Sequence, residues 1–574
     1  MIAIIFIVTC LALLAAYRFY GAFLDRQLQI DPDRPTPALE KPDGVDFVAA
    51  SKPVLFGHHF SSIAGAGPIV GPIIAGLAFG WGPALLWIVI GCALVGGVHD
   101  YTALMASIRH QGRSLGQVCR EYLSPVTYHL FLAFIWFALV YVIIVFLDLT
   151  ATTFAPAIRE AMSEARFATL DAQGGTVATS SLLYIGIALC FGVSVYRLRL
   201  PFRTATLIFV PLVFLSLWIG HLYPLSASRL PALMGSAKNT WCIVLLGYCL
   251  VASITPVWIL LQPRDYLSSF LLFACLGGGS LGLVIGGFGG NLPIQYSMYR
   301  GFVDTEFHLG PLFPALFITI ACGAVSGFHS IVASGTTSKQ LDNERSAKPI
   351  AYGSMLVEGG LAIVALATVM LLSRYEGGTP IAVFAAGIGK LFASFGFPEG
   401  AATTFGLLAV STFLLTTLDT CTRLARFIFQ EFFELRSARA RLLSTLASLA
   451  IPAIIVFKDI PGPGGILMPA WKAIWPVFGA SNQLLAALAL LVVFAWLRHE
   501  KRKTLYVLIP MVFMCVTTLK ALANLAAKNL ASGGSQLVGI ISLSLGIMAA
   551  AVIIDTMIHL VRQSAQRQPA APAA

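Results

Sequence analysis

The sequence contains few charged residues, and this scarcity already decides its broad class. Only 11% of its 574 residues are Asp, Glu, Lys or Arg, whereas soluble proteins carry about 25%. Hydrophobic residues make up 57% of the chain, and the mean hydropathy is +0.84. A soluble fold of this size has too little interior to bury so much apolar sequence. The sequence therefore predicts an all-α membrane protein that crosses the bilayer many times, with membrane lipid around it.

Several signatures of enzymes and binding domains are absent. The sequence has no Walker A motif and no glycine-rich turn that opens a βαβ unit, which argues against an ATP-driven pump and a dinucleotide-binding enzyme. Its 10 cysteines are scattered through apolar runs without metal-ligand spacing. We therefore expect no enzymatic activity, no metal site and no cofactor, and any energy source has to be an ion gradient. Membrane topology explains the net charge of +11 more simply than nucleic-acid binding does.

The apolar runs predict about fifteen membrane-spanning helices, each long enough for a ~30 Å hydrocarbon core. The first run, 2–20, lacks a basic leader and a small-residue cleavage site, so we expect an uncleaved helix with the N-terminus outside. Most Lys and Arg then fall in inner loops, notably 423–441 and 498–503, and the C-terminus lies inside. The expected location is the inner (cytoplasmic) membrane. We expect a leading helix and loop (1–53), a ten-helix core (54–420) and a four-helix region (421–574).

Two of these spans contain residues that break a helix near mid-membrane. Glycine and proline interrupt the run 54–80 around residues 65–68, and proline interrupts the run 239–262 around residues 253–256. The two breaks lie five spans apart, which predicts two inverted five-helix repeats, each opening with a discontinuous helix that binds substrate. Simple kinks are the alternative. The substrate-binding residues predicted here are His58, His59, Gly65, Ala66, Gly67, Pro68, Ser253, Thr255 and Pro256.

Ionisable and hydroxyl side chains within the spans are further candidates, because such groups are costly in a membrane. Glu358 lies about two turns inside the run 351–373, where a carboxyl group could carry a proton, and His58 and His59 are proton-linked candidates as well. Hydroxyl groups along 330–337 could instead bind Na⁺, and a structural role is the alternative for each group. Asp419 and Arg423, four residues apart, are expected to form a structural pair. The candidates for ion coupling are Asp100, Glu358, His329, Ser330, Ser334 and Thr337.

The same segments give the chain its resemblance to a known family. They read FGHHFSSIAGAGPIVGP (56–72), YCLVASITPVWILLQPRDYLSSF (248–270), GFHSIVASGTTSKQL (327–341), TTLDTCTRLAR (416–426) and FGASNQLLAALAL (478–490). Together they resemble the carbon starvation protein A (CstA) family over most of the chain. The resemblance implies uptake of peptides and pyruvate during nutrient limitation, coupled to protons in one branch. It also implies the LeuT-like five-plus-five fold of the amino acid–polyamine–organocation transporters.

We therefore expect a secondary active transporter that imports short peptides or pyruvate in the response to starvation, coupled to H⁺ or Na⁺, with H⁺ preferred. A membrane sensor that binds the same solute without moving it is the main alternative. A channel is a third possibility, and it predicts flux that neither saturates nor accumulates the solute. The oligomeric state does not follow from the sequence.

Overall fold

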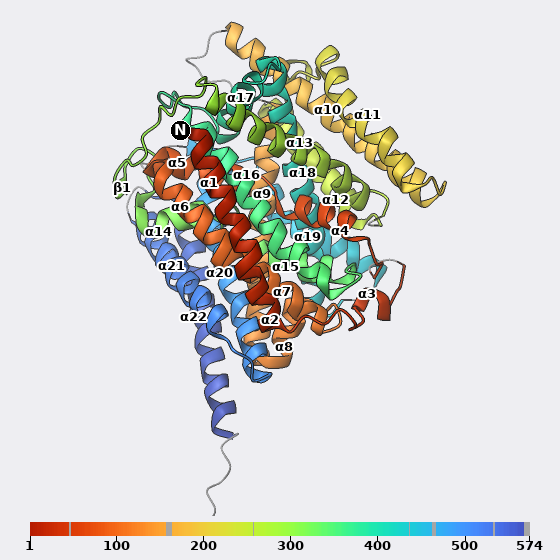
Figure 1. Ribbon diagram of the computed structural model, residues 1–574, viewed down its shortest axis with the longest axis vertical. Helices are drawn as coiled ribbons and strands as arrows, with labels where there is room; N and C mark the ends of the chain where they lie inside the picture. Colours follow the sequence, from red (N-terminus) through yellow and green to blue (C-terminus); the bar gives the residue numbers. More distant parts are fainter. Residues whose placement is uncertain are drawn as a thin grey trace, which may run out of the picture.

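A computed structural model describes residues 1–44, 47–155, 164–256, 258–435, 437–461, 467–531 and 534–566. These residues form an elongated bundle of helices (Figure 1). Twelve of the described helices are long and apolar enough to cross a membrane, and one bent pair raises the number to as many as 13. The expectation of an all-α polytopic membrane protein is confirmed.

The first half of the bundle consists of helices that follow one another along the chain with short connections. They are α1 (Ile2–Ala15), α2 (Gly21–Leu28), α3 (Pro37–Glu40), α4 (Lys52–Ile63), α5 (Gly67–Phe79), α6 (Trp81–Gly91), α7 (Gly97–Arg109), α8 (Leu115–Tyr122), α9 (Pro125–Phe154), α10 (Glu164–Tyr196), α11 (Phe202–Leu222) and α12 (Ala237–Ile254). The π-helical segments η1 (Ala16–Tyr20) and η2 (Cys92–Gly96) join α1 to α2 and α6 to α7.

The second half adds the remaining helices and two very short hairpins. The helices are α13 (Leu261–Phe288), α14 (Leu312–Thr319), α15 (Gly327–Gly335), α16 (Ser354–Met370), α17 (Pro380–Ala393), α18 (Glu399–Phe432), α19 (Ala438–Ile455), α20 (Ala470–His499), α21 (Leu505–Leu530) and α22 (Gln536–Gln566). Strand β1 (Val303–Asp304) pairs with β2 (Gly310–Pro311), and β3 (Ile460–Pro461) pairs with β4 (Leu467–Met468), both antiparallel.

Hydroxyl side chains fix where several of the long helices begin. Ser124 caps α9 by accepting a hydrogen bond from the backbone N–H of Thr127, and Ser236 caps α12 in the same way. Within the bundle, α9, α16, α18 and α20 belong to the most deeply buried spans and pack against their neighbours on several sides, whereas α10 and α11 form a hairpin that projects from it (Figure 1). The N-terminus and the end of α22 lie at opposite ends of the molecule (Figure 1).

Several helices depart from the spans expected from the sequence. The run 309–332 is not one helix, because α14 and α15 are separated by the non-helical residues 320–326. The apolar helix α17, of 14 residues, was not expected. Helix α18 continues to Phe432, so the boundary expected at 420/421 and the first part of the expected loop 423–441 both lie within one continuous helix.

Candidate substrate and ion-coupling site

The first break predicted from the sequence is present between α4 and α5. Helix α4 ends at Ile63, and α5 begins at Gly67 with Pro68 in its first turn, where a proline needs no amide hydrogen. The two helices meet at an angle of 45°. Residues 57–73 are buried throughout, as expected for backbone that leaves the helical path inside a membrane.

A second break lies directly against the first, between α14 and α15. Helix α5 packs on α14 and α4 packs on α15, so the two broken spans run in opposite directions with their breaks at the same level. The approach is so close that a methyl group added at Gly67 would collide with the side chain of Cys322. Glycine at position 67 is therefore required by packing as well as by the change of chain direction.

A small cavity lies between the two breaks. Its volume is ≈ 10 Å³, at the lower limit for a single water molecule. It is lined by residues of both breaks and of the helices beside them: Ile63, Gly65, Gly67, Val142, Phe146, Cys322, Phe328, Thr417 and Phe478. A three-carbon acid would enter this cavity only if the surrounding helices moved apart.

Asn482 of α20 supports the second break. Its Oδ1 accepts hydrogen bonds from the backbone N–H of Phe328 at 3.0 Å and from the hydroxyl of Ser326 at 3.3 Å. Its amide Nδ2 lies 3.0 Å from the Ser326 hydroxyl and 3.4 Å from the Cys322 sulfur. Sequence reasoning assigned Asn482 no role, although it stands as a polar pair with Gln483 in an otherwise apolar run.

Three ionisable residues from three different helices meet beside the breaks. His329 of α15 places Nδ1 2.8 Å from Asp100 Oδ2 of α7 and Nε2 3.3 Å from Glu358 Oε2 of α16. All three side chains are completely buried. We call Asp100, His329 and Glu358 the triad. The sequence analysis named all three as candidates for ion coupling without foreseeing that they touch.

Both helices that supply the carboxylates contain a π-helical segment shortly before the acidic residue. Segment η2 precedes Asp100, and η7 (Lys348–Gly353) precedes Glu358. The two segments touch each other, because the Tyr352 hydroxyl donates a 3.0 Å hydrogen bond to the carbonyl of Ala93. Such local widening of a helix is frequent at functional sites, and here it precedes both acidic groups of the triad.

The other candidates on α4, α7 and α15 surround the triad. His99 Nδ1 lies 2.7 Å from the second oxygen of Asp100, and His59 Nδ1 lies 2.8 Å from the hydroxyl of Thr337. The hydroxyls of Ser330 and Ser334 instead donate to carbonyls of their own helix, Gly327 and Ser330, at 2.7 and 2.8 Å. These bonds use only the hydroxyl hydrogens, so the oxygen lone pairs of both serines stay available as ligands and the candidate Na⁺ site along α15 stays a prediction.

A second buried group of charges lies on another side of α4. Arg264 of α13 forms ion pairs with Asp265, at 3.2 Å, and with Asp419 of α18. Arg264 also donates to the hydroxyl of Tyr248 at 2.6 Å. His58 Nδ1 lies 3.3 Å from Asp265 Oδ2. Within the described residues, no group of three or more His, Cys, Asp or Glu side chains has a metal-binding arrangement.

The segment 253–256 does not form the expected break in the middle of a span. Helix α12 ends at Ile254, and Thr255 and Pro256 follow in the connection to α13. Arg423 donates to the carbonyl oxygens of Ala252 and Thr255 at 2.8 and 2.6 Å. Proline ends the helix here, and arginine side chains bind its terminal carbonyls. The structure therefore does not bring Ser253, Thr255 and Pro256 into the cavity between the breaks.

Asp419 also differs from its expected arrangement. Its carboxylate binds Arg264 of α13 and accepts a 3.0 Å hydrogen bond from Tyr248, whereas Arg423 reaches the end of α12. Spacing along one helix indicates which residues share a face, but it does not show whether a closer partner exists on another helix. The arginine and the two aspartates are all visible in the sequence, yet their contact follows only from the packing of α13 on α18.

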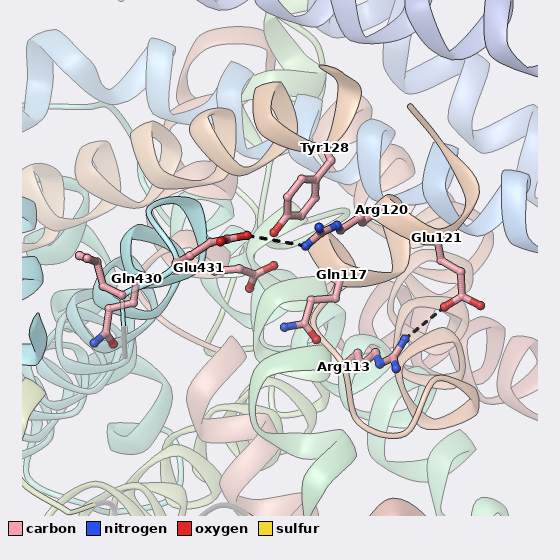
Figure 2. A pocket seen from close by; sticks show the side chains of 9 residues that line it. Arg113, Gln117, Arg120, Glu121, Tyr128, Gln430 and Glu431 are labelled. Atoms are coloured by element: carbon pink, nitrogen blue, oxygen red, sulfur yellow. Dashed lines mark hydrogen bonds and ion pairs between the residues drawn. The ribbon is translucent and has the colours of Figure 1, made fainter. Parts of the chain in front are cut away.

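A larger surface pocket, of ≈ 640 Å³, lies between the α8–α9 region and the end of α18. Its charged side chains have both signs and pair with each other, including Arg113 with Glu121 at 3.3 Å and Arg120 with Glu434 at 4.0 Å (Figure 2). The Ser114 hydroxyl, which caps α8, also donates to Glu431. These contacts join α8 to α18 and leave no uniform charge that would attract an anion or a cation.

Comparison with known proteins gives a consistent result. The family model described as carbon starvation protein CstA matches residues 1–377 and 373–521. A peptide transporter CstA of Bacillus subtilis is 32% identical over 96% of this chain and 96% of its own length. A pyruvate/proton symporter, BtsT, of Escherichia coli is 32% identical over 89% of this chain and 79% of its own. A peptide transporter CstA of Campylobacter jejuni is 33% identical over 88% of this chain and 77% of its own length.

Among solved structures, the manganese transporter of Eremococcus coleocola aligns with 91% of this chain and 99% of its own, at 14% identity and a TM-score of 0.41. That score is too low to establish a common fold. The family match and the relatives show a multi-pass transporter of the bacterial inner membrane, and not an enzyme, in agreement with the sequence analysis. The chain belongs to the carbon starvation protein CstA family.

Proposed function

We propose that this protein is a proton-coupled symporter that imports a small solute bearing a carboxylate, either pyruvate or a short peptide. The observation that carries the proposal is the completely buried triad beside two facing helix breaks. The names of the relatives support both solutes and, for one relative, the proton. Supply of carbon during starvation is the corresponding cellular role.

The charge of the triad favours a proton over Na⁺ as the coupling ion. Two carboxylates and one imidazolium carry one excess negative charge, which is costly in a fully buried position. One further proton on Glu358 makes the group neutral and leaves a hydroxyl that can donate to a neighbour.

The two breaks supply a place for the substrate. Helices α5 and α15 both begin at the breaks, and the dipole of a helix favours a carboxylate near its N-terminus. Gly65, Ala66, Gly67 and Pro68 would then lie next to the substrate. Since the cavity is now far smaller than pyruvate, binding requires the helices around it to separate.

We further propose that the LeuT-like five-plus-five arrangement holds, with α14–α15 and not 239–262 as the discontinuous helix opposite α4–α5. Because α14–α15 is the seventh span after α4–α5, two of the intervening spans would be additions to the two repeats. The twelve long helices, the bent pair, the α14–α15 pair and α19 would together give the expected fifteen crossings. An odd number of crossings puts the N-terminus and the end of α22 on opposite sides of the membrane, which agrees with their positions in Figure 1.

Uptake into proteoliposomes tests this function. Labelled pyruvate and a labelled dipeptide are offered separately under an inward proton gradient, an inward Na⁺ gradient and no gradient. We expect the proton gradient alone to drive accumulation of at least one solute above its external concentration. Binding without accumulation under every gradient would favour the sensor, and flux that never exceeds equilibration would favour a channel.

A further inference from the structure

The charges on the other side of α4 form a group that has no part in the triad. Arg264 lies between Asp265 and Asp419, and the Tyr248 hydroxyl, to which Arg264 donates, itself donates to Asp419. The side chains of Arg264 and Asp265 are completely buried, and that of Asp419 is nearly so. Because a guanidinium always keeps its proton in proteins, this part of the group has one positive and two negative charges.

His58 is the imidazole that faces this excess negative charge. Its Nδ1 lies 3.3 Å from Asp265 Oδ2, and its side chain is buried. In the described part of the chain, neither ring nitrogen of His58 forms a hydrogen bond with a side chain or backbone group, so Nδ1 meets Asp265 only as a close charge contact. A buried imidazole nitrogen without a partner, next to a carboxylate that is only partly neutralised, is suited to bind a proton.

We propose that His58 and Asp265 form a second proton-binding site, which takes up and releases one proton in each transport cycle. The lone pair of Nε2 accepts the proton, and the resulting imidazolium directs Nδ1–H toward Asp265. The group of His58, Arg264, Asp265 and Asp419 then changes from a net charge of −1 to neutral, and release of the proton restores it. This inference rests on the proposed function, because it assigns the site to the same transport cycle.

The site is linked to the cavity through α4. The hydroxyl of Ser62 donates to the His58 carbonyl at 2.8 Å and to Asp265 Oδ2 at 3.3 Å, and the next residue, Ile63, lines the cavity. Any movement of α4 that enlarges the cavity therefore alters the contact between His58 on α4 and Asp265 on α13. Binding of the second proton is in this way coupled to opening of the site.

The ionisable groups on all the helices around α4 agree with this assignment. Lys348 of η7 donates a 2.9 Å hydrogen bond to Asp25, and the Tyr352 hydroxyl donates to the Ala93 carbonyl. The triad and His59 lie toward α15 and α16. The groups that face His58 itself, or lie directly behind Asp265, are Asp265 and Arg264 of α13, Asp419 of α18, Tyr248 of α12 and Tyr184 of α10, whose hydroxyl donates to the Arg264 carbonyl. Arg423, a buried cation one turn after Asp419 on α18, also acts on Asp419, and it donates to the carbonyls of Ala252 and Thr255 at the end of α12.

The charge moved per molecule of pyruvate tests the proposal directly. Current and labelled uptake are measured together in proteoliposomes under an inward proton gradient. Pyruvate carries one negative charge, so two protons per cycle move about one positive charge inward with each molecule. With His58→Gln one proton remains, and we expect the ratio of current to uptake to fall to about zero while uptake continues. His221→Gln, at an exposed position on α11, is the matched control and should keep the original ratio.

A second measurement does not depend on a variant that transports. The ¹⁵N NMR signals of the His58 ring are followed in the unmodified protein in lipid nanodiscs and assigned by their proximity to the Asp265 carboxyl carbon. We expect the ring to change its protonation state within the pH range in which transport operates. A ring that keeps one state throughout that range, or an unchanged ratio of current to uptake in His58→Gln, would overturn the inference. Absence of proton-driven uptake of both pyruvate and a dipeptide in the unmodified protein would instead overturn the proposed function.

Discussion

At the scale of single residues, the protein buries sets of ionisable side chains in which two carboxylates share one basic group between them. The triad has two carboxylates for one imidazole, and Arg264 is shared by Asp265 and Asp419. Unpaired charge in a low-dielectric interior is unfavourable, so such sets persist in folded proteins when they have a function or a compensating partner. A carrier needs sites of this kind, because it has to bind and release a proton without unfolding.

The first prediction concerns Glu358 in the triad. Glu358→Gln removes the carboxyl group that would hold the transported proton but preserves its size. We expect accumulation driven by a proton gradient to fall at least tenfold, whereas exchange of internal for external labelled solute without a gradient continues. Glu376→Gln, which changes an exposed glutamate, is the control. Undiminished accumulation by Glu358→Gln would remove the triad from the coupling mechanism.

The second prediction concerns the stability that Arg264 provides. Arg264→Met leaves two buried carboxylates without their cation, and breaking a buried pair in this way costs about 3–5 kcal/mol. We expect a lower temperature of thermal unfolding in detergent, partly restored when Asp419→Asn is added to remove one of the two charges. Arg374→Met breaks an exposed pair and should change stability little. Equal melting temperatures for Arg264→Met and Arg374→Met would show that the buried ion pairs do not stabilise the fold.

At the scale of helices, the site depends on two broken spans that pack break against break. The sequence predicted the α4–α5 break correctly, because Gly65, Gly67 and Pro68 stand together in an apolar run. It did not predict the break between α14 and α15, whose residues 320–326 contain one glycine and no proline. That segment is held out of the helical path by Asn482 of α20, a partner that no local pattern reveals.

The third prediction tests the contact between the breaks. Gly67→Ala places a methyl group against Cys322, and overpacking of this kind costs about 1–3 kcal/mol. Both the sulfur and the β-carbon of Cys322 are too close to the new methyl group, whereas its α-carbon is 3.8 Å away. We therefore expect Gly67→Ala to impair uptake, Cys322→Gly to restore it in the double variant, and Cys322→Ala to fail to do so. Full activity of Gly67→Ala alone would contradict the close approach.

At the scale of the whole molecule, buried ion pairs close the bundle toward both of its ends. Toward one end, Glu344 accepts hydrogen bonds from Arg109 at 2.7 and 2.8 Å and from the backbone N–H of Asp31 at 3.0 Å. Toward the other, Lys238 donates to Asp148 at 2.7 Å, and Asp148 also accepts from the backbone N–H of Trp471. In transport by alternating access, the contacts of one of these sets would break while the contacts of the other stay formed.

The fourth prediction follows from the first of these sets. Glu344→Gln removes the charge that binds Arg109 and weakens the joint between α7, the loop after α2 and the segment that follows α15. We expect faster amide hydrogen exchange within 29–34 and 336–347, with little change elsewhere. Glu306→Gln, in an exposed pair with Arg300, is the control. Equal amide exchange rates within 29–34 and 336–347 in Glu344→Gln and Glu306→Gln would mean that Glu344 does not hold this end closed.

Hydropathy and family resemblance were enough to predict the class of protein, because lipid leaves only helices as spanning elements in such a chain. Individual site residues could be proposed because buried charge is rare in membranes: Asp100, His329 and Glu358 were all identified in this way. The contacts among these three residues, and the contact of His58 with Asp265, could not be predicted, because they depend on how helices far apart in the sequence pack. The placement of 253–256 failed for a local reason, since a proline can end a helix as readily as it breaks one.

The most direct test of the account is the movement of protons together with substrate. Proteoliposomes containing the protein are suspended in weakly buffered medium without Na⁺, and the external pH is recorded when pyruvate or a dipeptide is added. We predict that the medium becomes more alkaline in step with uptake of labelled solute, and that Glu358→Gln abolishes this change. Solute uptake without a change in external pH, or uptake that appears only when Na⁺ is supplied, would contradict the central claim.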